Sequence, residues 1–440
     1  MNFSTARYWN PVLETLPRDQ LEQLQLMKFK RAVNHVYTNS PFYRKKLDSA
    51  KIKPADIKTL PDIQKIPRTD KNELREAQQT DPYPYGALLA VSTEEVTAYH
   101  QTSGTTGQTV RQADSWRDWE WWSECWATIL WAQGFRPQDR VFIPFSYGVF
   151  IAFWAGHYAC EKIGCEVIPG GGLSTEDRIL KMKELQATAL MCTPTYALHM
   201  AEVAGRMGIN LPNELHIAKM LCSGEPGALI PATKRRIEER WGANVYDHAG
   251  ATEGGAWGFE CAEQPGGLHV NEAMFLVEVL DTETGQPVEP GGKGELVITP
   301  LDRKAQPYLR FNLKDTALLS EEPCKCGRSF RLLKGGVLGR SDRLTKIRGV
   351  LFSPTSVEEV VRAFPEFGDE YQVILQKKGE LDEVTVKVEM KPDERDHPDL
   401  EERLKQALRL HTGVRIHVEL EAHGTLPRFE VKANRFKDLR

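Results

Sequence analysis

The chain lacks long hydrophobic runs and a charge excess of one sign. No apolar stretch reaches the roughly 18 residues that a membrane-spanning helix needs. The formal net charge is −4 over 440 residues, so nothing indicates a nucleic acid or an anionic membrane as a partner. Internal repeats and low-complexity tracts are also absent, which argues against a repeat architecture.

Cysteine is scarce, and an export signal is missing. Eight cysteines in a chain of this size do not make a disulfide scaffold, and most lie in apolar runs as small buried groups. Met1–Pro17 mixes charged with aromatic residues and has no apolar core, so it is not a signal peptide. We therefore expect a cytoplasmic protein.

The composition is that of a globular protein, with 41% hydrophobic and 27% charged residues. A chain of 440 residues exceeds what one hydrophobic core usually supports, so we expect at least two domains. We place the boundary at about Gly339–Arg343. This divides the chain into an N-terminal domain of residues 1–340 and a small C-terminal domain of residues 343–440.

Short apolar runs alternate with helical stretches through the middle of the chain. The predicted buried strands are Val141–Phe145, Cys165–Pro169, Ala189–Pro194 and Ile217–Cys222, and the predicted helices are Arg18–Tyr37, Asp114–Gln133, Phe150–Lys162, Thr175–Gln186 and Pro231–Trp241. This alternation predicts an α/β fold with a doubly wound, mostly parallel sheet. After Gly254, Phe275–Leu280 and Glu295–Leu301 predict an antiparallel region, and the chain beyond Gly349 predicts a small α+β domain.

The most informative stretch is the glycine-rich segment Tyr99–Gln108, which contains Thr102, Ser103, Gly104, Thr105, Thr106 and Gly107. Glycine lets the backbone approach a ligand closely, and successive N–H groups beside hydroxyl side chains form a cradle for phosphate oxygens. It is not the P-loop of nucleotide triphosphatases, because that motif ends in Gly-Lys-Ser/Thr and Gln108 follows Gly107. The alternative is a polar surface turn.

Further motifs follow in a fixed order. They are Ser223-Gly224-Glu225-Pro226, Ala249-Gly250-Ala251-Thr252-Glu253, Arg310–Asp315, Gly339–Arg343 and Leu426–Lys432. This ordered set resembles the adenylate-forming superfamily of acyl-CoA synthetases. With Tyr8–Glu14, Asn39–Tyr43 and Cys192–Leu198 added, the chain most resembles the phenylacetate–CoA ligase family over essentially its whole length.

The resemblance implies an ATP-dependent carboxylate–CoA ligase for an aryl or arylacetic acid, with Mg²⁺ as cofactor and CoA as co-substrate. The acid would first form an acyl-adenylate, and the CoA thiol would then displace AMP. Such a reaction gathers negative charge, so the site must supply cations and oriented donors. A homodimer is expected from the family alone.

The family's motifs imply a role for each matching residue. Thr102–Gly107 would hold the β- and γ-phosphates, Ser223–Pro226 the adenine, Thr252 the α-phosphate, Glu253 the Mg²⁺ ion, Asp315 the ribose hydroxyls, and Arg340 the ribose-phosphate region. Lys432 would be the catalytic lysine of the first half-reaction, and Asp342 the hinge about which the small domain rotates.

Each of these residues also has an ordinary interpretation. Glu253 could be a solvated loop acid, and Asp315 could pair with Lys314 or Arg310. Lys432 could be a solvated lysine near the chain end, and Asp342 a boundary residue without a hinge role.

The pocket for the acid is the least defined part of the prediction. The resemblance implies Tyr147, Gly148, Phe150, Ala249 and Gly250, although the aromatic residues could equally belong to the core. Family members have small glycines where this chain has Ala152 and Phe153, so added bulk would reshape the pocket. Three further departures are Gln108 for a lysine, Ala249 for a tyrosine and Val431 for a glycine.

A second set of residues has the chemistry of a zinc site. Cys324 and Cys326 form a tight Cys-x-Cys pair, and Cys261 with His269 could supply two more ligands. Three thiolates and one imidazole make a closed tetrahedral Zn²⁺ site of structural type. The alternatives are reduced thiols or a Cys324–Cys326 redox pair.

Two other functions are compatible with the same motifs. A stand-alone adenylation enzyme would load a separate carrier protein instead of CoA. A non-catalytic nucleotide-binding protein would keep the fold without the reaction, but the joint presence of Glu253, Asp315, Asp342 and Lys432 argues against it.

Overall fold

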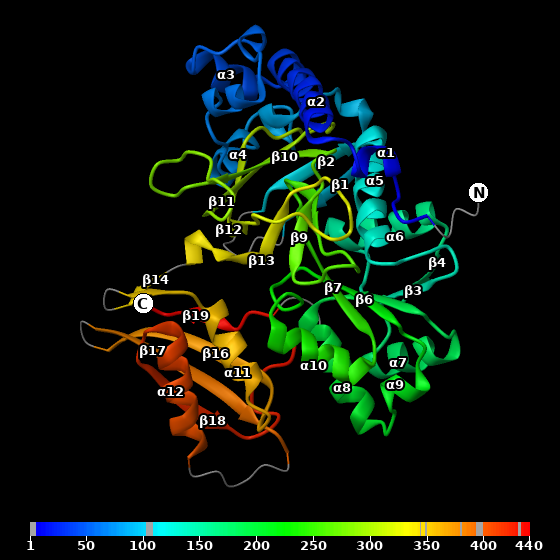
Figure 1. The fold of residues 1–440 in the computed structure, drawn as a ribbon, viewed down its shortest axis with the longest axis vertical. Helices are drawn as coiled ribbons and strands as arrows, with labels where there is room; N and C mark the ends of the chain where they lie inside the picture. Colours follow the sequence, from blue (N-terminus) through cyan, green and yellow to red (C-terminus); the bar gives the residue numbers. More distant parts are fainter. Residues whose placement is uncertain are drawn as a thin grey trace. The chain divides into compact units, whose positions relative to one another are not determined.

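The computed structural model describes residues 6–102, 109–343, 345–347, 350–378, 381–392, 399–429 and 433–440. The chain forms two compact units (Figure 1). The first combines Met1–Gly172 with Tyr246–Leu338, and the second combines Leu173–Val245 with Gly339–Arg440. This grouping differs from the predicted domains 1–340 and 343–440, which remain a prediction.

The first unit begins with helices α1 (Pro11–Glu14), α2 (Arg18–Asn39), α3 (Pro41–Ser49) and α4 (Lys71–Ala77). The predicted helix 18–37 is confirmed as α2, which buries Leu21, Phe29 and Val33 on one face. Ser40 ends α2 and caps α3, since its side chain accepts from the Tyr43 N–H. The predicted Trp-rich helix is confirmed as α5 (Trp116–Ala132), most of whose residues are buried.

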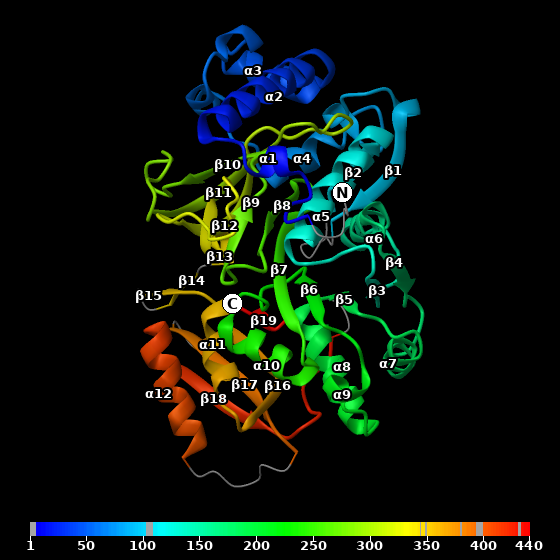
Figure 2. The ribbon, with the colours of Figure 1, turned by 45° about the vertical axis from the view of Figure 1, so that its right-hand side comes forward.

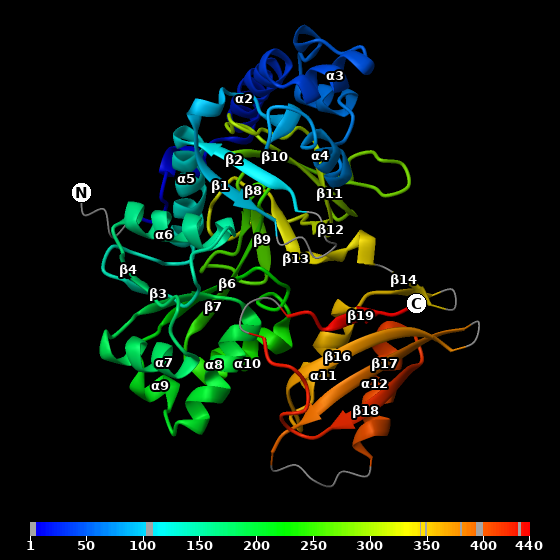
Figure 3. The same cartoon turned by 180° about the vertical axis from the view of Figure 1, so that it is seen from behind.

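Strands β1 (Val96–Gln101) and β2 (Arg111–Ser115) form an antiparallel hairpin. Figure 3 shows the two strands side by side. The glycine-rich segment connects them, and residues 103–108 lie outside the described part of the chain. Strands β3 (Arg140–Ile143) and β4 (Glu166–Pro169) pair in parallel and are connected by helix α6 (Ile151–Ile163).

The rest of the first unit is built mainly of antiparallel strands. These are β7 (Asn244–Ala251), β8 (Gly255–Phe259), β9 (Gly267–Val270), β10 (Phe275–Leu280), β11 (Lys293–Pro300), β12 (Phe311–Leu319) and β13 (Leu332–Arg340). Their order is β10–β11–β12–β13–β9–β8–β7. The predicted antiparallel region is confirmed, and it begins earlier than expected because β7 already pairs antiparallel with β8.

The second unit starts with α7 (Thr175–Glu184), β5 (Ala189–Cys192), α8 (Pro194–Arg206), α9 (Leu211–Glu214), β6 (Lys219–Ser223) and α10 (Pro231–Trp241). Strands β5 and β6 pair in parallel, as predicted. One boundary was wrong: Pro194 begins α8 rather than ending a strand, because the Thr193 side chain caps the helix by accepting from the Tyr196 N–H.

The C-terminal part of the second unit contains β14 (Thr345–Ile347), β15 (Val350–Phe352), α11 (Thr355–Ala363), β16 (Phe367–Lys378), β17 (Leu381–Met390), α12 (Leu400–Thr412), β18 (Ile416–Glu421) and β19 (Phe436–Asp438). The four-stranded sheet has the order β18–β17–β16–β19, and α11 and α12 lie side by side on it (Figure 2). The predicted mixed α/β class with a smaller C-terminal part is confirmed. Within the described ranges, no helix combines the length and apolarity that crossing a bilayer requires.

Candidate functional site

The turn between β7 and β8 holds two of the predicted site residues. Thr252 is 7% exposed and Glu253 is 4% exposed, so the alternative that Glu253 is a solvated loop acid is wrong. Gly255 closes the turn at φ +92°, where a side chain would be strained, and an added Cβ would lie 2.6 Å from the Trp121 ring. Glycine at position 255 therefore allows a tight turn that packs directly against the Trp121 and Phe275 rings.

A lysine that was not among the predicted site residues faces the Glu253 carboxylate. Lys71, the first residue of α4, places its Nζ atom 2.8 Å from Glu253 Oε1. A buried carboxylate needs such a compensating charge. No local pattern marks Lys71, because its partner is far away in the sequence.

Thr102 is buried at the start of the glycine-rich connection. Its N–H donates to the Val110 carbonyl at 3.0 Å, and its hydroxyl accepts from the Val110 N–H at 3.0 Å. These bonds close the ends of the connection. The other predicted phosphate-binding residues, Ser103, Gly104, Thr105, Thr106 and Gly107, lie outside the described residues, as does Gln108.

The motif Ser223–Pro226 follows β6, where Gly224 has φ +95°. The Glu225 carboxylate accepts from the Thr195 N–H at 2.9 Å and from the Ala433 N–H at 2.8 Å. Burial raises the pKa of Glu225 although the Arg435 charge opposes it. Ala433 directly follows Lys432, which itself lies outside the described residues, so the motif is bonded to the residue next to the predicted catalytic lysine.

Asp315 lies part-buried on β12. Of its two suggested partners, Arg310 forms an ion pair with Glu278 at 2.9 Å, and Lys314 lies 3.6 Å from Asp70. In the second unit, Arg340 and Asp342 pair with each other, with nitrogen–oxygen distances of 2.8 and 2.7 Å. The predicted ribose-phosphate residue and the predicted hinge residue therefore contact one another.

The predicted acid-pocket aromatics pack together at the start of α6. Tyr147 Oη lies 2.8 Å from His157 Nδ1, and its ring meets Trp154 edge-on at 4.8 Å. Burial raises the pKa of Tyr147. The Trp154 indole donates to the Gly148 carbonyl at 2.8 Å, while Phe150 stays 37% exposed.

Ala249 and Gly250 lie on β7, opposite Gly258 and Ala256 of β8, with a bulge between the two. Both residues lie within the strand, which continues to Ala251. The remaining predicted nucleotide residues divide between the units: Thr102, Thr252, Glu253 and Asp315 belong to the first, and Ser223–Pro226, Arg340 and Asp342 to the second.

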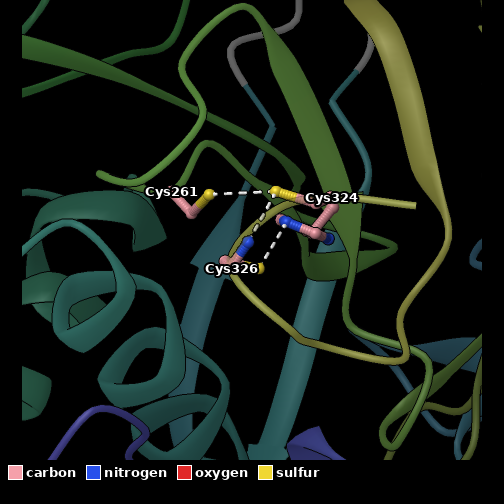
Figure 4. Close-up of side chains that lie close together, drawn as sticks. Cys261, Cys324 and Cys326 are labelled. Carbon is pink, nitrogen blue, oxygen red and sulfur yellow. Dashed lines mark hydrogen bonds between the residues drawn. The ribbon is translucent and has the colours of Figure 1, made fainter. Parts of the chain in front are cut away.

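The four predicted metal-ligating residues come together. Figure 4 shows the three thiols of Cys261, Cys324 and Cys326 facing one another, and the four potential ligand atoms, including one from His269, all lie within 4.8 Å of each other. Cys261 Sγ is 3.6 Å from Cys324 Sγ, and Cys326 Sγ is 3.3 Å from His269 Nε2. Ligands about 2.3 Å from a tetrahedral zinc ion stand roughly 3.8 Å apart, so the spacing suits that ion.

The electrostatics of this cluster favour a charged set of ligands. The hydrogen bond from the Cys261 thiol, followed by that from His269, lowers the pKa of Cys326 to about 2. Burial works against protonation of His269, but hydrogen bonds to Cys324 and Cys326 raise its pKa to about 9. No disulfide joins any of the eight cysteines, all of which lie in described segments.

Sequence and structure comparisons extend over the whole chain. Residues 23–300 match the family described as "AMP-binding enzyme", and residues 349–440 match the "AMP-binding enzyme C-terminal domain". The phenylacetate-coenzyme A ligase of Thermus thermophilus is 36% identical, with 98% of this chain and 99% of that protein aligned. The phenylacetate-coenzyme A ligase of Pseudomonas putida is 34% identical, with 97% and 96% aligned.

One similar solved structure is 2-hydroxyisobutyryl-CoA ligase in the postadenylation state, in complex with 2-HIB-AMP. It is 27% identical in sequence and gives a TM-score of 0.94. The match covers 100% of this chain and 94% of that one. The same ligase with 2-HIB-AMP and CoA in the thioesterification state is 28% identical and gives a TM-score of 0.76 over the same coverage. Both belong to a protein that joins an acid to CoA.

One prediction concerns His248, which precedes Ala249 on β7. Its ring packs at a tilt against Trp126, with ring centroids 4.3 Å apart, and bonds the Gly258 carbonyl through Nδ1 at 2.9 Å. Burial lowers its pKa to about 4, below the roughly 6.5 of an unfolded histidine. The unfolded state therefore binds the proton first as the pH falls, and stability is lost between about pH 6.5 and 4.

We expect the His248 contribution to the free energy of unfolding to fall by about 2 kcal/mol between pH 7.5 and 5. Urea denaturation of the wild type and of His248→Gln at both pH values measures it, and the variant should lack that part of the pH dependence. His216→Gln, at an exposed histidine, is the control. Equal pH dependence in all three proteins would contradict the assignment.

Proposed function

The chain belongs to the phenylacetate-coenzyme A ligase family of AMP-binding enzymes, and we propose that it joins an aryl or arylacetic acid to CoA. ATP activates the acid: a carboxylate oxygen attacks the α-phosphorus, and the bond to pyrophosphate breaks. The CoA thiol then attacks the acyl carbon, so that a thioester forms and AMP leaves.

The observation that carries the proposal is the buried turn of Thr252 and Glu253 beside Lys71. It supports a site where a carboxylate and a cation face a phosphorylated ligand, because the Glu253 carboxylate is buried just after β7 and the half-exposed Lys71 ammonium of α4 lies 2.8 Å from it. Glu253 would hold Mg²⁺, which when bound would neutralise phosphate charge. Thr252 would donate to the α-phosphate, and Lys71 would add positive charge to the phosphate site.

The remaining roles follow the family's motifs and are part of the same proposal. Thr102–Gly107 would bind the outer phosphates, Ser223–Pro226 the adenine, Asp315 the ribose and Arg340 the ribose-phosphate region. Asp342 would serve as the hinge between the domains 1–340 and 343–440, and breaking its pair with Arg340 would accompany the rotation. The homodimer and the cytoplasmic location stay predictions.

The aromatic side chains near the start of α6 support a flat apolar acid: Tyr147 meets Trp154 edge-on at 4.8 Å, and Phe150 meets Phe153 edge-on at 6.1 Å. Phenylacetate is the substrate that the names of the sequence relatives give. Phe153 stacks on Phe145 at 4.0 Å, so bulk lies where the family has glycine, and we propose an acid that differs in shape from phenylacetate.

The proposed activity is tested by pyrophosphate release with ATP and Mg²⁺, with and without CoA, across phenylacetate, benzoate, indolyl, 2-hydroxyisobutyrate and straight-chain acids. We expect release with aromatic acids, and stoichiometric AMP and thioester when CoA is present. Release without any thioester would instead support loading of a carrier protein. Turnover of aliphatic acids alone would contradict the proposed acid class, and silence across the panel would contradict the activity.

Lys432 is expected to act in the first half-reaction only. Lys432→Ala should lower acid-dependent ATP–pyrophosphate exchange by about 10²–10³-fold, since a point charge on the transition state is lost. Thioester formation from a supplied acyl-adenylate should be spared. The control is Lys437→Ala, at an exposed lysine of β19, and equal exchange rates in both variants would refute the role of Lys432.

We also propose that Cys261, His269, Cys324 and Cys326 hold a structural zinc ion. The orientation of the His269 imidazole supports this assignment. Its Nδ1 lies 3.4 Å from the Phe330 carbonyl, and its Nε2 faces the thiols. A histidine that binds a metal through one ring nitrogen commonly donates the other ring N–H to a carbonyl in this way. The Cys326 thiol also accepts from the Arg328 N–H at 3.4 Å.

Metal analysis of the purified chain should give about one zinc per chain, and Cys326→Ser should lose it together with several degrees of melting temperature. Cys165→Ser should keep the metal, because that buried thiol lies outside the four-residue cluster and bonds the Arg136 carbonyl at 3.2 Å. A wild-type chain that stays free of zinc after refolding with zinc under reducing conditions would exclude the site.

A further inference from the structure

Arg303 is a fully buried arginine between β11 and β12, with a side chain that is 0% exposed. Its guanidinium donates in two directions. One terminal nitrogen donates to Asp114 Oδ1 at 2.8 Å. The other donates to the Glu253 carbonyl at 2.7 Å and lies 3.2 Å from the Thr252 carbonyl.

The pair remains charged inside the protein. Burial pushes the pKa of Asp114 upward, but the Arg303 charge outweighs it and holds that pKa below its ordinary value. The faces of the guanidinium lie against the Trp122 and Tyr308 rings, 5.2 and 5.7 Å from the ring centroids. Aromatic faces attract a desolvated cation, so they help to keep the arginine in place.

A buried ion pair adds little stability compared with an apolar pair of similar volume. Stability therefore does not explain why this chain buries both charges. An apolar pair could not donate hydrogen bonds to the carbonyls of Thr252 and Glu253. Without the Arg303 guanidinium, these buried carbonyls would lose that donor.

Asp114 lies on β2, in the hairpin whose connection is the glycine-rich segment. Within that hairpin, His100 of β1 places Nδ1 3.7 Å from Asp114 Oδ2. Neighbouring bonds strengthen the link: Tyr308 donates to Gln112 at 2.8 Å, and Gln306 accepts from the Ala113 N–H at 2.8 Å. The segment that carries Arg303 is thus bonded along β2.

We propose that Arg303, held by Asp114, is the positioning residue that fixes the backbone of Thr252 and Glu253 relative to the glycine-rich hairpin. The inference rests on the proposed function, in which these two residues receive the α-phosphate and Mg²⁺. Arginine suits the role because its planar fork fixes two donor directions at once, whereas a lysine ammonium offers a single point charge.

Arg303→Lys tests the proposal, since it keeps the charge and loses the fork. We expect ATP–pyrophosphate exchange to fall by about 10–100-fold, because small misplacements of reacting groups have such effects. The Mg²⁺ concentration for half-maximal exchange should rise severalfold. In calorimetry, affinity for ATP with Mg²⁺ should fall, while affinity for ATP without Mg²⁺ stays as in the wild type.

Arg328→Lys is the matched control. Arg328 is equally buried and pairs with Glu14 at 2.7 Å, and its side chain has no recorded contact with Thr252 or Glu253 among the residues that the structure describes. We expect it to lose melting temperature without any change in Mg²⁺ dependence. Parallel losses in both variants, with Mg²⁺ dependence unchanged in each, would overturn the proposal.

Asp114→Asn provides a second route if Arg303→Lys does not fold. It removes the charge that holds the guanidinium and should shift Mg²⁺ dependence in the same direction, and an unchanged Mg²⁺ dependence in a folded Asp114→Asn would count against Arg303. A wild-type chain that binds ATP with Mg²⁺ but turns over no acid would contradict the proposed function, while the calorimetric comparison would still decide the role of Arg303.

Discussion

The interior of the first unit depends on buried charges that must leave water together with a partner. Arg303 with Asp114, Arg328 with Glu14 and Arg310 with Glu278 are buried pairs at 2.7 to 2.9 Å. Each pair joins segments that are distant in the sequence, so the need to pair the two charges specifies which segments meet. Leaving either charge alone in the interior would be costly, and the Arg303–Asp114 pair is the one that also bonds the turn of Thr252 and Glu253.

Charged pairs also join α10 to the C-terminal part of the second unit. Asp369 faces Arg236 and Arg362 at 3.3 and 3.5 Å, and Arg236 also donates to the Gly368 carbonyl at 2.9 Å. Polar surfaces of this kind remain hydrated when they separate, unlike an apolar core. The contact between α10 and the C-terminal segment is therefore rich in charge, which suits the rotation about Asp342 that we propose.

The sequence predicted what is encoded locally. Periodicity and short motifs predicted most of the helices and strands around residues 141–241, the antiparallel region and the clustering of Cys261, His269, Cys324 and Cys326, because most of these signals lie within a few residues of one another. Lys71 and Arg303 were missed, since their partners Glu253 and Asp114 are distant in the sequence. Helix α8 was missed because its apolar start continues the run of β5, and only the Thr193 cap separates the two.

In the proposed acid pocket, the family motif and the side-chain packing of this chain lead to different expectations. The motif around Phe150 predicted an aromatic pocket, and the structure gathers those rings at the start of α6, but Phe153 fills space by stacking on Phe145 at 4.0 Å. A stacked pair of this kind is held by packing as well as by ring electrostatics, so an acid entering there must fit beside it rather than displace it. In the proposed pocket, Phe153 departs from the family and is thus the residue whose packing would select the substrate, while the nearby Phe150, which is 37% exposed, would remain available for contact with the acid.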